Sequence, residues 1–230
     1  MEKALTLYQT SIGKKAVMAL SGVVLVGYAA GHMLGNLQLY AGPEVINAYA
    51  ASLRRLPLIL WGTRVLLLVA FAAHIASSFS LWRTNQAART TRYQQQKDVA
   101  TNYAARTMYW SGPILLLYVV YHLAHLTFGK APHSFDHHNV YNNLVYGFQV
   151  WWVSAIYVFG NLALGFHLFH GAWSFFQSLG LNHPRYNAWR KQFAIAVALV
   201  ITLGNLSFPF SVLAGWVKPT TKTFYFPELD

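Results

Sequence analysis

Five long apolar stretches constrain this chain more than any other feature of its sequence. They lie at about residues 14–39, 57–82, 106–128, 148–178 and 191–217, and a helix needs roughly 20 such residues to cross a bilayer. Only 10% of the 230 residues are charged, whereas a soluble domain carries about 25%. We therefore expect an all-α integral membrane protein with five transmembrane helices, folded as a single domain over residues 1–230. The fourth stretch is longer than a straight crossing needs, which predicts tilt or protrusion.

The distribution of lysine and arginine predicts the orientation, because cytoplasmic loops carry the excess of these residues. The N-terminus and the loops 83–106 and 179–191 hold eleven: Lys3, Lys14, Lys15, Arg83, Arg89, Arg92, Lys97, Arg106, Arg185, Arg190 and Lys191. The other side holds five: Arg54, Arg55, Lys130, Lys218 and Lys222. We expect a multi-pass protein of the cytoplasmic membrane, with its N-terminus inside and its C-terminus outside. The polar N-terminus and the lack of a small-residue cleavage site predict no cleaved signal peptide.

The absence of cysteine limits the metal chemistry that this chain can support. It excludes disulfides, thiolate-bound iron–sulfur clusters, c-type haem attachment and cysteine-based zinc sites. Histidine is common instead, at ten residues, while aspartate and glutamate together number six. A metal site would therefore depend on imidazole and carboxylate ligands.

Histidines occur inside four of the five apolar stretches, where ionisable side chains are functional candidates. They are His32 in the first, His74 in the second, His122 and His125 in the third, and His167 and His170 in the fourth. Counted from the predicted cytoplasmic ends, they fall into two layers roughly 10–15 Å apart, at about 1.5 Å per residue. The outer layer contains His32 with His122 or His125. The inner layer contains His74 with either histidine of the fourth stretch.

Two layers with histidines from different helices match the requirement of two bis-histidine haems stacked across a membrane. Each haem needs one imidazole on either side of its iron and small residues that leave room for the ring. Small residues flank the histidines: Gly27, Gly31 and Gly35 near His32, Gly160, Gly165 and Gly171 near His167, and Ala72 and Ala73 before His74. The alternative is that single histidines are hydrogen-bonded packing residues and that the glycines are helix contacts.

Four ordered segments of the chain resemble one membrane protein family. They are "SGVVLVGYAAGHMLGNL", "AGPEVINAYAASLRRLP" with His74 seventeen residues after its proline, "YHLAHL", and "GFHLFHGAWSFFQSLG". Over nearly its whole length the chain resembles the single-subunit, five-helix, dihaem cytochrome b anchor of succinate dehydrogenase and fumarate reductase, the succinate:quinone oxidoreductases. The resemblance implies a bundle of four helices that binds two haem b groups. It assigns His74 and His167 to the inner haem and His32 and His122 to the outer haem.

The resemblance also implies partners and substrates. A flavoprotein subunit and an iron–sulfur subunit would dock on the basic cytoplasmic face. Electrons would pass through the two haems between the iron–sulfur subunit and a membrane quinone, either menaquinone or ubiquinone. The chain would thus be the electron-transferring anchor subunit of the enzyme and would contribute no dicarboxylate chemistry.

Residues near the predicted haems and in the loops are secondary candidates. Those for a second shell or for haem propionates are His125, His170, Ser21, Gly31, Arg83 and Arg106. Those for quinone are Glu44, Arg64 and Tyr109, with Ser21 also near a cytoplasmic-side quinone. Glu44 has an equally good interpretation as a solvated loop charge, and Arg64 as a cation that extends to the membrane interface. His133, His137 and His138 are interpreted as solvated loop residues.

Four other functions are weaker alternatives. The cytochrome b of a quinol–cytochrome c reductase holds both haems between two helices, with histidines a dozen or more residues apart, whereas the spacing within a stretch here is three. A di-iron desaturase uses histidine boxes near the cytoplasmic surface, where this chain has only His183. Another haem b quinone-linked carrier, or a haem-free membrane protein that uses histidine for protons, remains an alternative until haem is measured.

Overall fold

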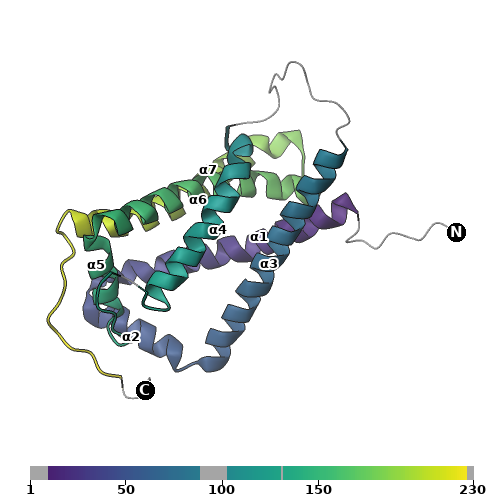
Figure 1. Ribbon diagram of the computed structural model, residues 1–230. Coiled ribbons are helices and arrows are strands. Elements are labelled where there is room, and N and C mark those ends of the chain that lie inside the picture. The colour runs from purple at the N-terminus through teal and green to yellow at the C-terminus, as the bar shows by residue number, and fades with distance from the viewer. Residues whose placement is uncertain (1–9, 89–102, 131, 227–230) are drawn as a thin grey trace.

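The computed structural model describes residues 10–88, 103–130 and 132–226, and these residues form helices joined by short connections (Figure 1). The α-helices are α1 (Ser11–Asn36), α2 (Pro43–Arg54), α3 (Pro57–Ala87), α4 (Tyr103–Leu126), α5 (Val140–Gln149), α6 (Trp151–Ser178) and α7 (Asn187–Leu213). Two 3₁₀ helices, η2 (Leu37–Ala41) and η3 (Pro184–Tyr186), follow α1 and precede α7. The described residues contain no β-strand, so the expectation of an all-α fold is confirmed.

Four helical segments in the described part of the chain are long and apolar enough to cross a membrane. They are Ser11–Ala41, Pro57–Ala87, Trp151–Ser178 and Pro184–Leu213. They correspond to the first, second, fourth and fifth predicted stretches, and they indicate a multi-pass membrane protein. The 24-residue helix α4 covers the third predicted stretch, but it includes Pro113, two histidines and several tyrosines and is not among the four. Its crossing therefore stays a prediction.

The fourth predicted stretch is divided between two helices. α5 ends at Gln149, Val150 adopts an extended backbone with φ −80° and ψ 108°, and α6 begins at Trp151. Most side chains of α5 are buried, including the small polar ones. The start of the stretch, which the sequence analysis assigned to a tilted or protruding span, therefore belongs to a separate packed helix.

Proline and glycine set several helix ends. Pro57 is the first residue of α3, where its missing N–H costs no helical hydrogen bond. Gly215 follows α7 with φ 73°, a left-handed conformation that favours glycine. Its N–H donates to the Val212 carbonyl at 3.0 Å, and the Trp216 N–H donates to the Ser211 carbonyl at 3.0 Å. This Schellman pairing satisfies carbonyls that the end of the helix would otherwise leave free.

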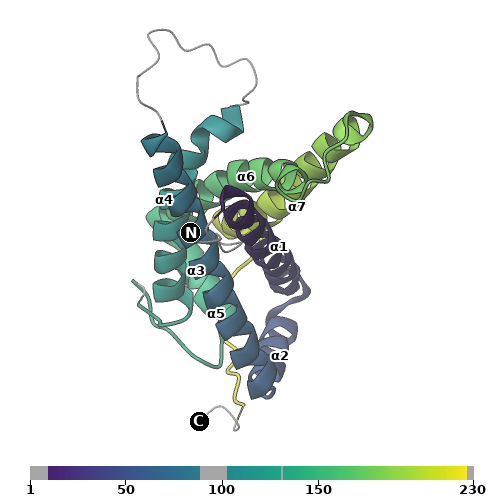
Figure 2. The same ribbon diagram turned by 90° about the vertical axis from the view of Figure 1, so that its right-hand side faces the viewer.

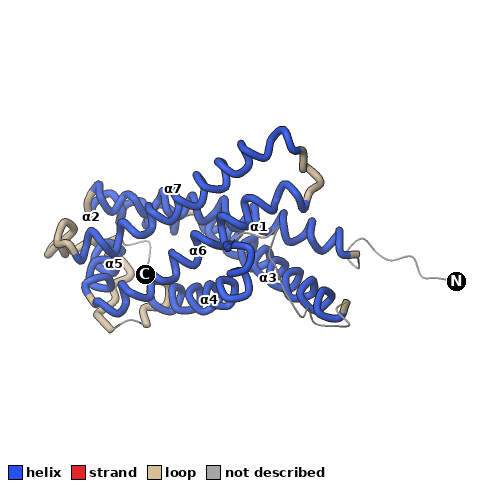
Figure 3. Tube along the Cα trace, turned by 90° about the horizontal axis from the view of Figure 1, so that it is seen from above, coloured by secondary structure: helices blue, strands red, loops and turns tan. Residues whose placement is uncertain are grey.

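The ends of the long helices gather at two opposite ends of the molecule (Figures 1 and 3). At one end lie α2, α5 and the C-terminal segment, as Figure 2 also shows. We call this end the cap, made of α2, residues 127–130 and 132–139, α5 and residues 214–226. The opposite end holds the start of α1, the end of α3 and η3. The predicted cytoplasmic loop 83–106 and the N-terminus fall mostly outside the described residues.

The cap is joined by buried amide groups. Asn47 of α2 donates to the Asn139 side-chain oxygen at 3.2 Å and accepts from the Tyr141 backbone N–H at 3.0 Å. Asn142 donates to the Thr220 carbonyl at 2.8 Å and accepts from the Thr220 N–H at 3.0 Å. Because buried polar groups are costly without partners, these bonds hold α2, α5 and the C-terminal segment in one arrangement.

Helix packing leaves the histidine-bearing helices in a specific order. The most extensive packing joins α6 to α7, α1 to α3, and α4 to α6, and α1 also contacts α6 and α7. Among the described residues, α1 with α4 and α3 with α6 are not closely packed pairs. These two diagonal pairs are the ones on which the sequence predicts facing histidines.

Candidate functional site

Two pairs of imidazoles face each other across the interior of the helices. His32 of α1 and His122 of α4 have ring centroids 5.9 Å apart. His74 of α3 and His167 of α6 have ring centroids 6.1 Å apart. Each pair joins two helices that do not pack closely, so four different helices contribute one imidazole each.

The spacing of both pairs fits a metal ion held between two imidazoles. Two metal–nitrogen bonds of about 2 Å, together with the half-widths of the two rings, separate the centroids by about 6 Å. Both observed separations lie close to this value. The described residues contain no group of three or more histidine or acidic side chains that could hold a metal ion. Each candidate donor set is therefore two imidazoles from different helices, which is the number a bis-histidine haem needs and too few for a tetrahedral zinc site.

His74 has one ring nitrogen held by its surroundings. Its Nδ1 lies 3.0 Å from the Met18 carbonyl oxygen and 3.3 Å from the Ser21 hydroxyl. A carbonyl only accepts, so Nδ1 carries the proton and Nε2 keeps its lone pair. Histidines that bind metals usually donate their second N–H in this way. Ser21, a predicted second-shell residue, therefore lies against the imidazole of an inner ligand candidate.

His167 has a similar neighbour that the sequence analysis missed. The hydroxyl of Ser111, a buried residue of α4, lies 3.4 Å from His167 Nδ1. Ser21 and Ser111 both precede a glycine in the first and third apolar stretches, within "LSG" and "WSG". This repeated dipeptide was the available signal. The two serines give the inner pair a comparable hydroxyl beside each imidazole.

The outer pair has less uniform surroundings. His122 Nδ1 lies 3.3 Å from the hydroxyl of Tyr157 on α6, and its Nε2 has no hydrogen-bond partner among the described residues. His32 instead has its Nε2 3.2 Å from the Asn36 side-chain nitrogen. A ligand role through Nε2 requires the His32 ring to leave the Asn36 amide, or to turn by half a rotation about its Cβ–Cγ bond.

Where one helix carries two histidines three residues apart, on α4 and on α6, the two histidines have different surroundings. His125 is 1% exposed, and both of its nitrogens have partners: Nδ1 contacts the Tyr157 hydroxyl at 2.9 Å and Nε2 contacts His133 at 3.3 Å. It therefore has no nitrogen available for iron, which favours His122. His170 has a buried Nδ1 with no hydrogen-bond partner in the described part of the protein.

A second buried polar atom without a partner lies beside the inner pair. The Ser77 hydroxyl is fully buried and makes no hydrogen bond to the described residues. Ser77 follows His74 by three residues, just as His170 follows His167. Buried polar groups are normally hydrogen-bonded. Two such atoms lie one helical turn from the inner histidines His74 and His167. This is consistent with a site where a polar cofactor or substrate supplies their hydrogen bonds.

The glycines near the histidines divide into two groups. A Cβ added at Gly27, Gly31 or Gly171 would meet no atom within 4 Å. These three therefore leave open space beside the helices, as a ring slot requires. The expectation is wrong for the other three, because side chains already fill the space. An added Cβ would lie 2.9 Å from Tyr49 at Gly35, 2.3 Å from Tyr118 at Gly160 and 2.6 Å from Thr202 at Gly165.

The predicted cations of α3 and α4 lie on exposed parts of their helices. Arg83 and Arg106 are exposed near the end of α3 and the start of α4, where both would face the cytoplasm in the expected orientation. Arg64 is also exposed, and its guanidinium lies 4.7 Å from the centre of the Trp61 ring. That cation–π contact accounts for Arg64 without a ligand.

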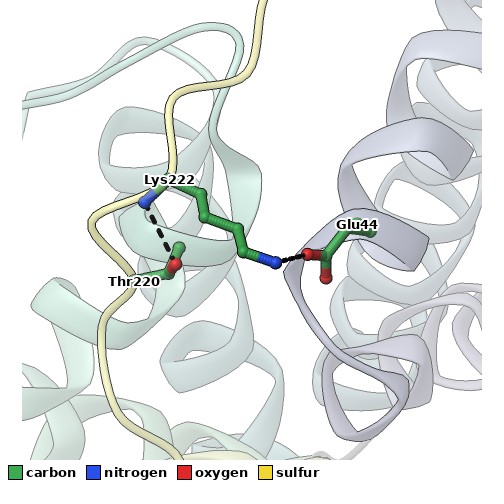
Figure 4. A network of polar contacts seen from close by, with 3 residues as sticks. All are labelled: Glu44, Thr220 and Lys222. Atoms are coloured by element: carbon green, nitrogen blue, oxygen red, sulfur yellow. Dashed lines mark hydrogen bonds and ion pairs between the residues drawn. The ribbon is translucent and has the colours of Figure 1, made fainter.

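The three quinone candidates are not brought together. Tyr109 is 58% exposed, on the part of α4 farthest from the cap, whereas Glu44 and Arg64 lie at or near the cap. Glu44 forms an exposed ion pair with Lys222 of the C-terminal segment (Figure 4). This hydrogen bond lowers the pKa of the Glu44 carboxyl. The geometry supports the interpretation of Glu44 as a surface charge.

A cavity of about 150 Å³ lies between the outer pair and the cap. Its lining includes His32, His122, Asn36, Arg54 and Asn143. The sequence analysis used Arg54 only as an orientation signal. It is the one cation in the lining of this cavity, and its guanidinium also donates to the carbonyl of His137.

Comparisons with protein-family models, with curated proteins and with solved structures found no match. The case for a function therefore rests on the residues and their arrangement.

Proposed function

We propose that this chain is the dihaem cytochrome b membrane anchor of a succinate:quinone oxidoreductase. The observation that carries the proposal is the pair of facing imidazole sets, at 5.9 and 6.1 Å between ring centroids, drawn from four different helices. His74 and His167 would hold the inner haem b, and His32 and His122 would hold the outer haem b. The resemblance of the four sequence segments to this family supports the same assignment.

The protein's own residues prepare both sites for iron. The Met18 carbonyl and the Tyr157 hydroxyl each hold the Nδ1 side of a ligand imidazole, which leaves the Nε2 lone pair of His74 and His122 for the metal. Haem iron, when bound, supplies one-electron transfer between its ferrous and ferric states. The four histidines lie on apolar helices, with His32 exposed and the other three half-buried. Two haems held there would offer two redox centres across the membrane.

The proposed complex includes partners on one face. All five apolar stretches cross the membrane, with the N-terminus in the cytoplasm and the C-terminus outside. A flavoprotein subunit and an iron–sulfur subunit dock on the basic cytoplasmic side, and menaquinone or ubiquinone is the membrane substrate. The chain is then part of an enzyme, as its electron-transferring and anchoring subunit.

Haem content is the first test. The full-length chain, purified from membranes in detergent, should contain two haem b groups per polypeptide and give a reduced absorption spectrum of the b type. Alanine at any one of the four ligand histidines should remove one haem. His183→Ala is the matched control, since His183 is an exposed loop residue whose Nδ1 accepts from the Arg185 backbone at 3.2 Å. A chain with no haem, or with one, contradicts the proposal.

Partner identity needs a separate measurement. The chain isolated with its native complex should carry bound flavin and iron–sulfur signals, and its haems should be reduced by succinate. Two haems without succinate or fumarate activity towards quinones would instead identify another quinone-linked haem b carrier.

A further inference from the structure

A continuous line of hydrogen bonds runs from the outer pair of imidazoles into the cap. His122 Nδ1 lies 3.3 Å from the Tyr157 hydroxyl, and that hydroxyl lies 2.9 Å from His125 Nδ1. His125 Nε2 then lies 3.3 Å from His133 Nε2, and His133 Nδ1 lies 2.9 Å from the Ser134 carbonyl. The groups come from α4, α6 and the connection between α4 and α5.

For neutral imidazoles, the last acceptor in the line determines which atom donates in every hydrogen bond of the line. A carbonyl only accepts, so His133 Nδ1 carries a proton and a neutral His133 accepts at Nε2. His125 must then donate from Nε2 and accept at Nδ1, which makes the Tyr157 hydroxyl its donor. The Tyr157 oxygen is left to accept from His122 Nδ1. The direction set at Ser134 therefore leaves His122 Nε2 with a lone pair.

The middle of this line is buried and closely packed. His125 is 1% exposed and Tyr157 is 4% exposed, so an unpaired group here would be costly. A Cβ added at Gly147 of α5 would lie 2.7 Å from the His125 ring and 3.3 Å from His133 Nε2. Only glycine allows α5 to approach the two imidazoles this closely. The fold thus builds this contact from three separate segments, and His133 is a half-buried loop residue where the sequence predicted a solvated one.

We propose that Tyr157, His125 and His133 are positioning residues that hold His122 as an outer-haem ligand, with Nδ1 as donor and Nε2 free for iron. This inference rests on the proposed function and deepens it, because it makes the electronic character of one haem depend on the cap. When the ring nitrogen that does not bind the metal donates a hydrogen bond, the ligand imidazole becomes more basic and stabilises the oxidised metal. Loss of the acceptor should raise the midpoint potential of the outer haem and leave that of the inner haem unchanged.

The test is a redox titration of both haems in membranes that contain the full chain with its complex, followed by absorbance, with haem content measured in parallel. Tyr157→Phe removes the acceptor and keeps the ring. His125→Leu removes the second link, whereas His125→Gln keeps an amide oxygen to accept from Tyr157 and an amide N–H to donate to His133. Tyr121→Phe is the matched control, because the buried Tyr121 hydroxyl has no partner among the described residues and its ring contacts both His125 and Tyr157.

The following results together support the proposal. Tyr157→Phe and His125→Leu should shift the potential of one haem upwards, and His125→Gln should restore a value near that of the unaltered protein. Tyr121→Phe should change neither haem. Gly147→Ala should repeat the one-haem shift by separating His125 from His133 without removing a hydrogen-bonding group, which keeps the test usable if Tyr157→Phe fails to assemble.

Other results overturn the proposal. Two haems with unchanged potentials in Tyr157→Phe, or a glutamine variant indistinguishable from the leucine variant, contradict the positioning role while the proposed function stands. An equal shift in both haems also contradicts it, since His74 has no contact with the line. An unaltered chain without haem contradicts the proposed function itself.

Discussion

The two imidazole pairs differ in the groups that lie behind their rings. Behind His74 is a main-chain carbonyl, that of Met18, on the neighbouring helix α1. Behind His122 are three side chains in succession, beginning with Tyr157 and ending in the cap. A main-chain acceptor is present whatever the sequence, whereas a line of side chains is lost when any member changes. His74 should therefore tolerate substitutions of its neighbours better than His122 does.

The comparison also shows how far each pair depends on distant parts of the fold. The contacts of the inner pair come from the long helices alone, through Ser21 of α1 and Ser111 of α4. The outer pair lies beside the cavity under the cap, which brings Arg54 of α2 and Asn143 of α5 close to it. Disturbing the cap should consequently affect the outer pair first.

The largest expected effect comes from the ligands themselves. Alanine at His32 or His122 should remove the same haem, and alanine at His74 or His167 should remove the other, because each iron needs both of its imidazoles. Difference spectra of the four variants should therefore fall into two matching sets. If the His32 variant resembles the His74 variant, the assignment of His32 and His122 to one haem is contradicted.

The second effect tests the dependence of the outer pair on the cap. Asn47→Leu removes an amide that is 1% exposed and leaves the Tyr141 N–H without its acceptor, which should cost about 1–3 kcal/mol. Thermal denaturation in detergent should show a lower midpoint, and the outer haem should be lost before the inner haem. Ser52→Ala is the control, since the exposed Ser52 hydroxyl only contacts the Tyr49 carbonyl of its own helix. Simultaneous loss of both haems would remove the distinction between the pairs.

A third, smaller effect separates the two ligands of the inner pair. Ser21→Ala leaves His74 with the Met18 carbonyl, so the inner haem potential should hardly move. Ser111→Ala removes the hydroxyl that lies 3.4 Å from His167 Nδ1, so a larger shift is expected. Redox titration of both variants measures the order. A larger shift for Ser21→Ala would show that the hydroxyl, and not the carbonyl, determines the state of His74.

The lengths of the apolar stretches and the positions of the histidines along them made much of this arrangement predictable from the sequence. Apolar length located the helices within a few residues, and Pro57 marked the start of α3 where the structure has it. Counting residues along the helices grouped the histidines into two layers, and the structure places His32 opposite His122 and His74 opposite His167. Helical spacing carries this information because it is local to each helix.

The features that the sequence did not predict depend on contacts between segments. Hydropathy treated residues 148–150 as part of one span, although the extended backbone of Val150 separates α5 from α6. His133 lies in a loop, as predicted, but the fold places it against His125, with Gly147 making room for both. Gly165 looked like a slot beside His167, but Thr202 of α7 fills that space. None of these contacts has a signature at fixed sequence spacing.

The smallest expected effect concerns the surface of the cap. The hydrogen bond with Lys222 lowers the pKa of Glu44, so the pair stabilises the folded chain above the ordinary glutamate pKa and is lost as pH falls through the lowered value. Both side chains are more than half exposed, so solvent screens the interaction. Glu44→Gln should lower the thermal midpoint slightly at neutral pH and not at strongly acidic pH, and Lys222→Gln should match it. The Glu44–Lys222 pair lies on the surface and does not contact the outer imidazoles. A change in either haem potential in these variants would therefore show that Glu44 has a functional role.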